Sequence, residues 1–298
     1  SAHRAGEPSE RRAQFARAVG RQLDAEAYDI VHVRGPFEGV MVADLRGPET
    51  KLIYEVATFA DEAEGPLAEE EWEASHVRCL EAADLVLVGA EAAARALGER
   101  GYAGKVAVVG PGVDVDSFDW WPRAPSAETR IVYLGSFAAD REIVTLLSAL
   151  RAASQRVPLQ ALIAGDPDPD RRDEVRRLVD AFDLSGLVDV QGDPRPVALP
   201  SIIAAADLAV VTASATPRFR ELGDLPQPLL EYLACRRAVI AAGVPAVAEI
   251  VRDEREGLLY PPGDESSLAD AIVALATDPD LRDSLVARAY ERTRRVFS

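Results

Sequence analysis

Short apolar runs alternate with helix-length amphipathic segments along almost the whole chain, and this alternation limits the fold more than any other feature. In the first part of the chain, strand-like runs occupy residues 29–33, 52–56, 85–88 and 106–109, and helical segments occupy residues 11–23, 69–82 and 91–100. Continuous runs of Val, Ile and Leu are typical of strands that are buried on both faces. A strict alternation of strand and helix therefore predicts a parallel sheet covered by helices.

The alternation stops at residues 114–125 and then begins again. This stretch contains Phe118 and the adjacent pair Trp120 and Trp121, which we expect to pack at a domain junction. Beyond it, strands are predicted at residues 130–134, 159–164, 187–190, 208–212, 238–241 and 258–260, and helices at 143–154, 171–182, 199–205, 229–234, 267–276 and 281–297.

A chain of 298 residues has room for about two domains. We therefore expect an α/β protein with two tandem doubly wound Rossmann-like domains, residues 1–118 and 119–298, whose last helix is available to cross back to the first domain. In such sheets ligands bind beyond the carboxyl ends of the strands. With two facing domains, the cleft between them is the expected site.

The charge balance excludes several classes of partner. There are 50 acidic residues against 33 basic ones, and the formal net charge is −17. A general nucleic-acid binder needs a surplus of Lys and Arg, so none is expected here, and contact with an anionic membrane should be at most weak and local. Cys79 and Cys235 are too few for a disulfide framework or a Cys-based zinc site. The polar start of the chain and the lack of a membrane-spanning apolar run favour a cytoplasmic protein.

Four stretches carry a recognisable pattern, and they occur in a fixed order. They read Val-Gly-Pro-Gly-Val-Asp at 109–114, Tyr-Leu-Gly-Ser-Phe at 133–137 followed by Arg141, Leu-Leu-Glu-Tyr-Leu-Ala at 229–234, and Gly-Leu-Leu-Tyr-Pro-Pro-Gly-Asp at 257–264. Together they resemble the family 4 retaining glycosyltransferases (glycosyl transferases group 1), which have the GT-B fold. The resemblance extends over residues 29–298 and implies an acceptor-side first domain and a second domain that binds a nucleotide sugar. It also implies that no metal or other cofactor is needed.

Ser136 and Arg141 lie in the stretch that resembles the phosphate loop of the family. When a nucleoside diphosphate leaves, negative charge builds on it, and cations, backbone N–H groups and helix N-termini can stabilise that charge. Arg141 stands where the family carries Lys, and a guanidinium can bind phosphate through two hydrogen bonds. Ser136 replaces the usual Arg, so one cation is missing. The alternative for Arg141 is an exposed charge in the first turn of a helix.

Glu231 matches the acidic residue that binds ribose in the family. A carboxylate only accepts hydrogen bonds and can take them from both ribose hydroxyls. The alternative is a helix-terminal Glu that the helix dipole stabilises. Gln227, Pro228 and Leu229 belong to the preceding loop, whose backbone we expect to approach the diphosphate, and Pro228 stands where a related variant has Lys.

Further candidate residues rest on weaker parts of the resemblance. The family often has a donor-sugar Glu at the position of Gly223, and the flanking Glu221 and Asp224 could take over this catalytic role. Gly192 and Asp193 resemble the loop that contacts the nucleobase, although an ordinary strand-to-helix turn would look the same.

The first half of the chain is less informative. Nothing in residues 1–26 resembles the strand and Gly-rich loop with which the family begins, so we expect that first strand to be missing. Glu55 is a candidate acceptor-side contact, with simple burial at a strand end as the alternative, and His32 is expected to be a near-core histidine. Asp166 and Asp168 superficially match a metal motif, but they should open a surface loop, so no metal is expected there.

The sequence thus predicts an enzyme that transfers a sugar from a nucleoside-diphosphate sugar to an unknown acceptor with retention of configuration, in polysaccharide, glycolipid or other glycoconjugate assembly. The alternative is a degenerate, non-catalytic relative that binds a nucleotide sugar or a protein partner, and Ser136 and Gly223 favour it. A nucleotide-sugar epimerase would require a cluster of acid and base residues that the sequence lacks. The central expectation is that Glu231 and Arg141 bind one nucleoside diphosphate.

Overall fold

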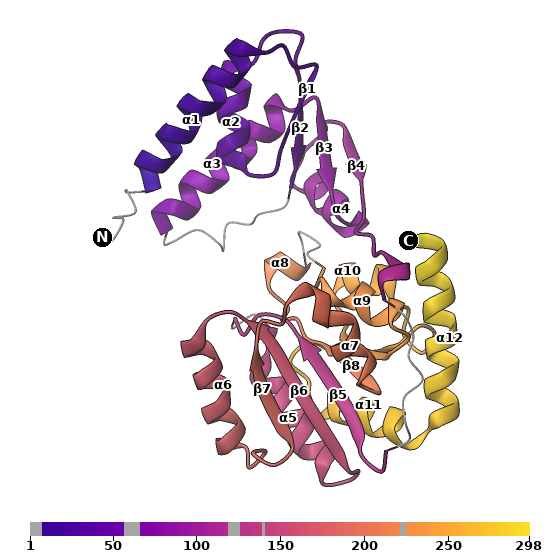
Figure 1. Ribbon diagram of the computed structural model, residues 1–298. Coiled ribbons are helices and arrows are strands. Elements are labelled where there is room, and N and C mark those ends of the chain that lie inside the picture. Colours follow the sequence, from indigo (N-terminus) through magenta and orange to yellow (C-terminus); the bar gives the residue numbers. More distant parts are fainter. Residues whose placement is uncertain (1–7, 57–65, 119–125, 139–140, 221–224) are drawn as a thin grey trace. The chain divides into compact units, whose positions relative to one another are not determined.

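The computed structural model describes residues 8–56, 66–118, 126–138, 141–220 and 225–298 (Figure 1). The chain divides into two compact units, Ser1–Gly110 and Pro111–Ser298. The expected boundary lay after Phe118, but residues 111–118 group with the second unit because the N–H of Val113 donates to the carbonyl of Phe297 at 2.8 Å and the side chain of Val115 joins the second core. Trp120 and Trp121 lie outside the described residues.

The first unit is a four-stranded parallel sheet with helices. Its strands lie side by side in chain order: β1 (Ile30–Val33), β2 (Lys51–Glu55), β3 (Leu85–Val88) and β4 (Val106–Val108). Its helices are α1 (Pro8–Ala25), α2 (Pro36–Leu45), α3 (Pro66–Ala82) and α4 (Glu91–Glu99). The predicted strands are confirmed, as are the helices α1, α3 and α4.

The core of the first unit lies on one face of its sheet. Right-handed crossovers that step along a sheet in one direction place every connecting helix on the same face. The buried set joins alternate strand residues to helix residues: Val33, Leu52, Tyr54, Val86, Val88, Val42, Cys79, Leu80, Ala93 and Leu97. On the strands, Ile53, Leu85 and Leu87 point the other way and are only partly buried, and Ile30 is 57% exposed. Among the residues described, burial on both faces therefore does not hold for this unit.

Helix α2 is absent from the sequence prediction, which assigned no helix between the strands at 29–33 and 52–56. Pro36 is instead in the first turn of the helix. A backbone N–H there has no acceptor within the helix, so the lack of an N–H in proline breaks no helical hydrogen bond. Pro36, Gly39 and Val42 of this helix are buried. Its apolar residues are not confined to one side, so the periodicity that identified the other helices is not present.

The second unit is a six-stranded parallel sheet in the order β10-β9-β8-β5-β6-β7. Its strands are β5 (Thr129–Leu134), β6 (Leu159–Asp166), β7 (Val188–Gly192), β8 (Leu208–Val211), β9 (Ala238–Ala242) and β10 (Leu258–Tyr260). Its helices are α5 (Ile143–Ser154), α6 (Pro169–Ala181), α7 (Leu199–Ala204), α8 (Pro217–Arg220), α9 (Pro228–Ala234), α10 (Pro245–Ile250), α11 (Glu265–Thr277) and α12 (Pro279–Val296). This is the doubly wound order, and the direction of winding reverses between β5 and β8.

Burial in the second unit matches the prediction for strands covered on both faces. Every residue of β8 and of β9 is buried, and the last four residues of β5 are buried as well. Helix α5 packs against α11, and α12 packs against α9 and β9. The central strands are thus fixed from both sides, and the loops at their carboxyl ends start from a rigid base.

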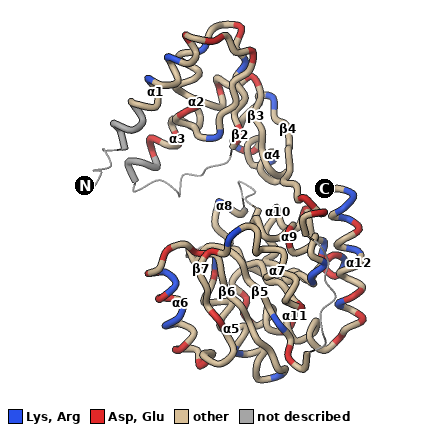
Figure 2. The backbone as a smooth tube through the Cα atoms, viewed as in Figure 1, with Lys and Arg blue, Asp and Glu red and all other residues tan. Residues whose placement is uncertain are grey.

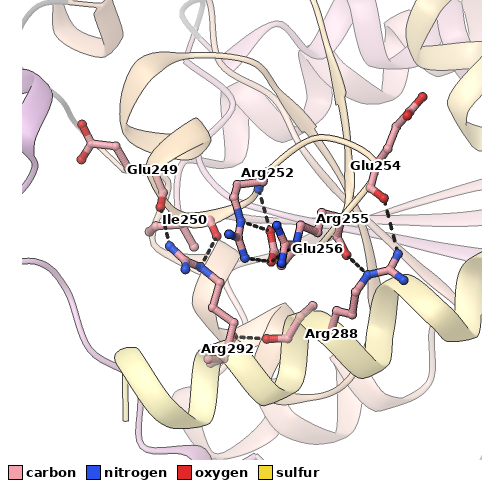
Figure 3. A network of polar contacts seen from close by, with 10 residues as sticks. Glu249, Ile250, Arg252, Glu254, Arg255, Glu256, Arg288 and Arg292 are labelled. Atoms are coloured by element: carbon pink, nitrogen blue, oxygen red, sulfur yellow. Dashed lines mark hydrogen bonds and ion pairs between the residues drawn. The ribbon is translucent and has the colours of Figure 1, made fainter.

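A polar network attaches α12 to the segment that follows α10 (Figure 3). Glu256 is 2% exposed, and its carboxylate accepts from the backbone N–H and the Nε of Arg252 at 3.0 and 2.9 Å. From α12, Arg292 donates to the carbonyls of Glu249 and Ile250, and Arg288 donates to the carbonyl of Arg255. The carbonyl of Phe297, which accepts from the N–H of Val113, lies at the end of α12. By fixing α12, the network therefore also helps to position this acceptor.

Basic and acidic residues alternate on α6 and α12 (Figure 2). On α6, Arg172 donates to the backbone carbonyl of Asp166 at 3.1 Å. Arg176 forms an ion pair with Asp173 at 2.9 Å and donates to the carbonyl of Val190 at 3.0 Å. Arg176 is therefore paired with an acidic residue of the same helix, and Arg172 is held by a backbone carbonyl.

Candidate functional site

The reversal point of the second sheet defines the candidate site. The loops that leave β5 and β8 at their carboxyl ends turn in opposite directions, because the chain continues toward β6 from one and toward β9 from the other. In doubly wound sheets the crevice between two such loops holds the ligand. Ser136 and Arg141 belong to the first loop, and Gln227 and Glu231 follow the second.

The N–H groups of the loop after β5 are largely used within the protein. The N–H of Gly135 donates to the carbonyl of Ala164 at 2.9 Å. The N–H of Ala138 donates to the hydroxyl of Ser136 at 3.0 Å, so this hydroxyl acts as an acceptor in a local turn. Ser136 therefore shapes the loop, whatever contact it also makes with a ligand.

Asp166 fixes this loop from the end of β6. It is 2% exposed, and its carboxylate accepts from the N–H of Phe137 at 2.8 Å and of Asp168 at 2.9 Å. Burial raises its pKa, but the two N–H groups and Arg171 outweigh burial, and the pKa ends below its usual range. The carboxylates of Asp166 and Asp168 thus have structural roles, since Asp168 caps α6.

Gly165 lets the loops after β5 and β6 touch. Its φ is +126°, and a Cβ at this position would lie 2.7 Å from the nitrogen and 2.8 Å from the oxygen of Gly135. Only glycine fits such a close approach between two backbones.

Arg141 lies at the base of α5 and faces an aromatic ring. Its guanidinium carbon is 4.8 Å from the centre of the ring of Phe219, which is fully buried in α8. This is the geometry of a cation–π contact. The backbone carbonyl of Arg141 accepts from the hydroxyl of Thr212, directly after β8. The two loops at the reversal point are therefore bonded to each other.

Glu142 is the next residue, and it has the backbone conformation of a glycine. Its φ is +50°, in the left-handed region that glycine adopts most readily. The half-buried carboxylate accepts from the N–H of Gly263 at 3.0 Å. Burial raises the pKa of Glu142, and the hydrogen bond from Gly263 lowers it by less. The contact joins the predicted phosphate loop to the turn at 257–264.

Glu231 lies in the first turn of α9, beside a small cavity of about 190 Å³. The cavity is lined by Pro111, Gly112, Val113, Asp114, Phe118, Leu225, Gln227, Leu230 and Glu231. Burial raises the pKa of Glu231. Among the residues described, no donor bonds its carboxylate. A partly desolvated carboxylate without a partner is unfavourable in the free protein, and it is free to accept hydrogen bonds from a ligand.

The neighbours of Glu231 have mixed roles. Tyr232 is fully buried, and its hydroxyl accepts from the N–H of Leu134 at 2.7 Å, which anchors α9 beneath β5. Gln227 is exposed and lines the cavity, whereas the side chain of Leu229 is fully buried. The N–H of Leu229 donates to Pro226 at 3.1 Å, and Pro228 has no N–H to offer.

The remaining donor-side candidates lie elsewhere or outside the described part. Glu221 and Asp224 are among the residues that the structure does not describe. Gly192 ends β7, at the edge of the sheet, with Asp193 directly after it. A Cβ on Gly192 would lie 3.1 Å from the guanidinium of Arg172. Within the ranges described, no hydrogen bond links these two residues to Glu231, and they do not line the cavity beside it. Joint action of Arg141 and Glu231 on one ligand remains a prediction.

In the first unit, Glu55 ends β2 and pairs with two basic groups. Its carboxylate lies 3.0 Å from Nε2 of His32 and 3.2 Å from Nε of Arg34. The His32 side chain is 45% exposed, so the prediction of a near-core histidine is wrong. The cause is its position: β1 is an edge strand, and His32 points to the side of the sheet opposite the core.

Among the described residues, the buried histidine is His76, for which the sequence predicted no role. It is 2% exposed, its Nδ1 lies 2.8 Å from the hydroxyl of Tyr54, and its ring stacks on Trp72 with centroids 4.7 Å apart. Burial, and then the charge of Arg100, lower the pKa of His76 to about 4. His76 also lines a cavity of about 1080 Å³ between α3 and the turn at 100–104. The spacing of 22 residues between Tyr54 and His76 gave no signal in the sequence.

Within the described ranges, no group of three or more His, Cys, Asp or Glu residues is arranged to hold a metal ion. Across the same residues, no helix is both long and apolar enough to cross a bilayer.

Comparisons with known proteins agree with this architecture. Two parallel α/β sheets with these connections define a GT-B fold, and the solved structures most like this one include glycosyltransferases of that fold. The sequence pattern of the glycosyl transferases group 1 family matches residues 128–278, and that of the glycosyl transferase 4-like domain matches residues 2–112. The chain belongs to the glycosyl transferases group 1 family.

Several characterised relatives are known. The chain is 30% identical over 160 residues to the alpha-D-kanosaminyltransferase of Streptomyces kanamyceticus, covering 53% of this chain and 39% of that protein. It is 29% identical over 313 residues to the D-inositol 3-phosphate glycosyltransferase of Kribbella flavida, covering 93% of this chain and 70% of that protein. With the first of these and two similar relatives, the match spans less than half of the relative's length.

Solved structures are similar in fold at low sequence identity. Sucrose-phosphate synthase of Thermosynechococcus elongatus aligns with a TM-score of 0.82 at 24% identity, over 100% of this chain and 77% of that one. Anabaena Alr3699/HepE, solved in complex with UDP and glucose, aligns with a TM-score of 0.75 at 17% identity, over 96% of this chain and 77% of that one.

Proposed function

We propose that this protein is a retaining glycosyltransferase that moves a sugar from a nucleoside-diphosphate sugar to an acceptor hydroxyl in glycoconjugate assembly. One observation carries the proposal: Glu231 is a half-buried carboxylate that lines a cavity and has no hydrogen-bond donor among the described residues. Such a group is stabilised when a ligand brings donors to it.

A ribose fits the requirement of Glu231. Its two neighbouring hydroxyls are donors that one carboxylate can receive together, and hydrogen bonds to a charged group are stronger than those between neutral groups. Solved relatives of the same fold carry UDP, and this supports a nucleotide as the source of the ribose.

The diphosphate would lie over the loop after β5. When the bond between the anomeric carbon and the phosphate oxygen breaks, the departing diphosphate gains charge, and the acceptor oxygen forms the new bond as it loses its proton. The positive end of α5 and the guanidinium of Arg141 are the groups of this chain suited to stabilise that charge. No metal is assigned a role in this proposal.

The acceptor belongs to the first unit in this proposal, with Glu55 as a candidate contact. Relatives named for D-inositol 3-phosphate and for phosphatidyl-myo-inositol support testing cyclitol acceptors first. We place the reaction in the cytoplasm, where nucleotide sugars are available, with no role for nucleic acid and at most weak contact with a membrane surface.

A non-catalytic protein that binds nucleotide sugars is the second candidate, and a specific observation favours it. Ser136 and Pro228 stand where family patterns have Arg and Lys, and several N–H groups of the loop after β5 are already bonded within the protein. Fewer groups are then left to stabilise the leaving diphosphate, which lowers the expected rate more than the expected affinity.

The first experiment measures thermal stabilisation by UDP, GDP and ADP. A ligand present at about 100 times its Kd stabilises the folded state by about 2.7 kcal/mol. We expect one nucleotide to raise the melting temperature of the wild-type protein, and Glu231→Gln to remove most of that rise. Glu265→Gln is the matched control, because Glu265 is an exposed Glu in the first turn of α11. If no nucleotide stabilises the wild-type protein, the proposal fails.

A second measurement separates the two candidates. The protein is incubated with the nucleotide sugars of the base that binds best, with and without cyclitol and sugar acceptors, and release of the nucleoside diphosphate is followed. Release that depends on acceptor supports the enzyme. Binding without hydrolysis or transfer across all acceptors supports the non-catalytic protein instead.

A further inference from the structure

A hydroxyl side chain occurs at every second position directly after β8. Residues 212–216 read Thr-Ala-Ser-Ala-Thr, and β8 ends at Val211. The segment therefore begins at the carboxyl edge of the sheet, on the β8 side of the reversal point between β5 and β8. None of these hydroxyls belongs to the motifs that predicted the site.

The three hydroxyls differ in their hydrogen-bond partners. The hydroxyl of Thr212 donates to the backbone carbonyl of Arg141. The hydroxyls of Ser214 and Thr216 are buried, and no hydrogen-bond partner for them lies among the residues that the structure describes. A buried polar group that is left unpaired loses its bonds to water and gains none in return, so two in one short segment destabilise the free protein. Such groups in a native protein call for a functional explanation.

The position of the segment indicates what the missing partner is. Through the bond from Thr212, it is attached to the loop that carries Arg141. The end of the segment is bonded to α8, because the carbonyl of Thr216 accepts from the N–H of Phe219 at 3.1 Å. The ring of Phe219 in turn makes the cation–π contact with the guanidinium of Arg141. The segment that carries the two hydroxyls is therefore bonded to the loop that carries Arg141, at the reversal point.

We propose that Ser214 and Thr216 bind the diphosphate of the nucleotide ligand, each donating a hydrogen bond from its hydroxyl to a phosphate oxygen. This inference rests on the proposed function. Phosphate oxygens accept only, they are charged, and a hydrogen bond to a charged acceptor is about twice as strong as a neutral one. Glu231, as a carboxylate, cannot receive a phosphate group, so it and the two hydroxyls serve different parts of the same ligand.

The test uses variants that remove only the hydroxyls: Ser214→Ala, Thr216→Val and the double variant. Because neither hydroxyl has a partner among the described residues, we expect the melting temperature without ligand to stay the same or rise. With UDP, GDP or ADP, whichever stabilises the wild-type protein most, we expect at least a tenfold loss of affinity in the double variant. The matching nucleoside, which has no phosphate, should bind the variants and the wild-type protein equally.

Thr212→Val is the matched control, since its hydroxyl does have a partner in the protein. We expect it to lower the melting temperature of the free protein. The comparison shows whether the hydroxyls of this segment are structural in general or whether Ser214 and Thr216 differ from Thr212, as proposed.

Three outcomes would overturn the inference. The first is a lower melting temperature of the ligand-free Ser214→Ala and Thr216→Val variants with unchanged nucleotide affinity, which would indicate a structural role. The second is an equal loss of affinity for the nucleoside, which would exclude a phosphate contact. The third is retention of full affinity by the double variant while Glu231→Gln loses it; the proposed function would then stand without this inference. If the wild-type protein binds no nucleotide, the proposed function fails first.

Discussion

Glu142 accepts a hydrogen bond from the N–H of Gly263 at 3.0 Å, which connects two turns that are 121 residues apart in the chain. One turn follows β5 and leads into α5, and the other follows β10 and leads into α11. The two helices pack against each other, so the contact joins the turns that precede two packed helices. It is formed although Glu142 must adopt a φ of +50° to make it.

The first prediction concerns this conformation. A residue with a Cβ at positive φ is destabilised by about 1 kcal/mol relative to glycine. Glu142→Ala loses the hydrogen bond and keeps the strain, whereas Glu142→Gly loses the hydrogen bond and relieves the strain. We expect the glycine variant to be about 1 kcal/mol more stable than the alanine variant in urea unfolding. Equal free energies of unfolding would contradict the left-handed conformation.

The second prediction concerns His76 and acid. Its pKa is lowered to about 4, first by burial and then by Arg100. The unfolded chain therefore binds a proton more readily than the folded one, so stability is fully present above about pH 6.5 and is lost as the pH falls toward 4. Each pKa unit corresponds to about 1.4 kcal/mol, so the loss is a few kcal/mol.

Two measurements check the His76 prediction. The imidazole signals are followed by NMR between pH 7 and 4, and the signal missing in His76→Gln identifies His76. We expect that signal to remain that of a neutral ring down to about pH 5. We also expect His76→Gln to lose part of the dependence of stability on pH over the same range. A His76 signal that titrates near pH 6.5 would contradict the buried contact with Tyr54.

The third prediction concerns the network that fixes α12. Glu256 is 2% exposed, whereas its partner Arg252 is 43% exposed, so only the carboxylate side of this ion pair is buried. Replacing the carboxylate by an amide leaves one of its donors unpaired, so Glu256→Gln should reduce the free energy of unfolding by about 1–3 kcal/mol. The neighbouring Glu254→Gln, where only the backbone carbonyl joins the network, should stay within about 0.5 kcal/mol of the wild type. Equal effects in urea unfolding would show that the carboxylate of Glu256 is not the important group.

The fold could be predicted from the sequence wherever local pattern and final structure depend on the same physics. Val, Ile and Leu runs identified β5, β8 and β9, because a buried parallel strand needs apolar residues at consecutive positions. The same reasoning failed for α2, whose apolar residues are not confined to one side, and for His32, whose exposure depends on the edge position of β1. Whether a strand lies at the edge or in the centre of a sheet depends on which strands pair with it, and the sequence of the strand itself does not contain that information.

The candidate site was predictable to the level of its loops. Glu231 and Arg141 were located by motif, and the structure places both beyond the carboxyl ends of the strands at the reversal point. The bonds of the loop were not predictable, because they join residues distant in sequence, such as Phe137 with Asp166. An unpaired hydroxyl such as that of Ser214 is likewise a property of the folded chain, since only the final packing decides which donors find an acceptor.

The last prediction concerns Glu231, where stability and binding should respond in opposite directions. Burial raises the pKa of this carboxylate, so the folded protein holds the proton more tightly than the unfolded chain. Its contribution to stability is therefore fully present below the unfolded pKa and is lost as the pH rises through the raised one. At pH 7 the free protein carries an unfavourable charge, and Glu231→Gln should melt higher than the wild type without ligand.

Nucleotide binding should show the reverse. The ribose hydroxyls need the ionised carboxylate, so Glu231→Gln should bind at least about tenfold more weakly at pH 7, from the loss of hydrogen bonds worth about 1.5–3 kcal/mol each to a charged group. In the wild-type protein, affinity should fall on acidification at a higher pH than for an ordinary Glu, as protonation removes an acceptor. Melting curves of both proteins from pH 4 to 8, with and without nucleotide, test both effects together. A Gln variant that is less stable without ligand, or a wild-type affinity that does not change with pH, would mean that the carboxylate of Glu231 serves the fold and not a ligand.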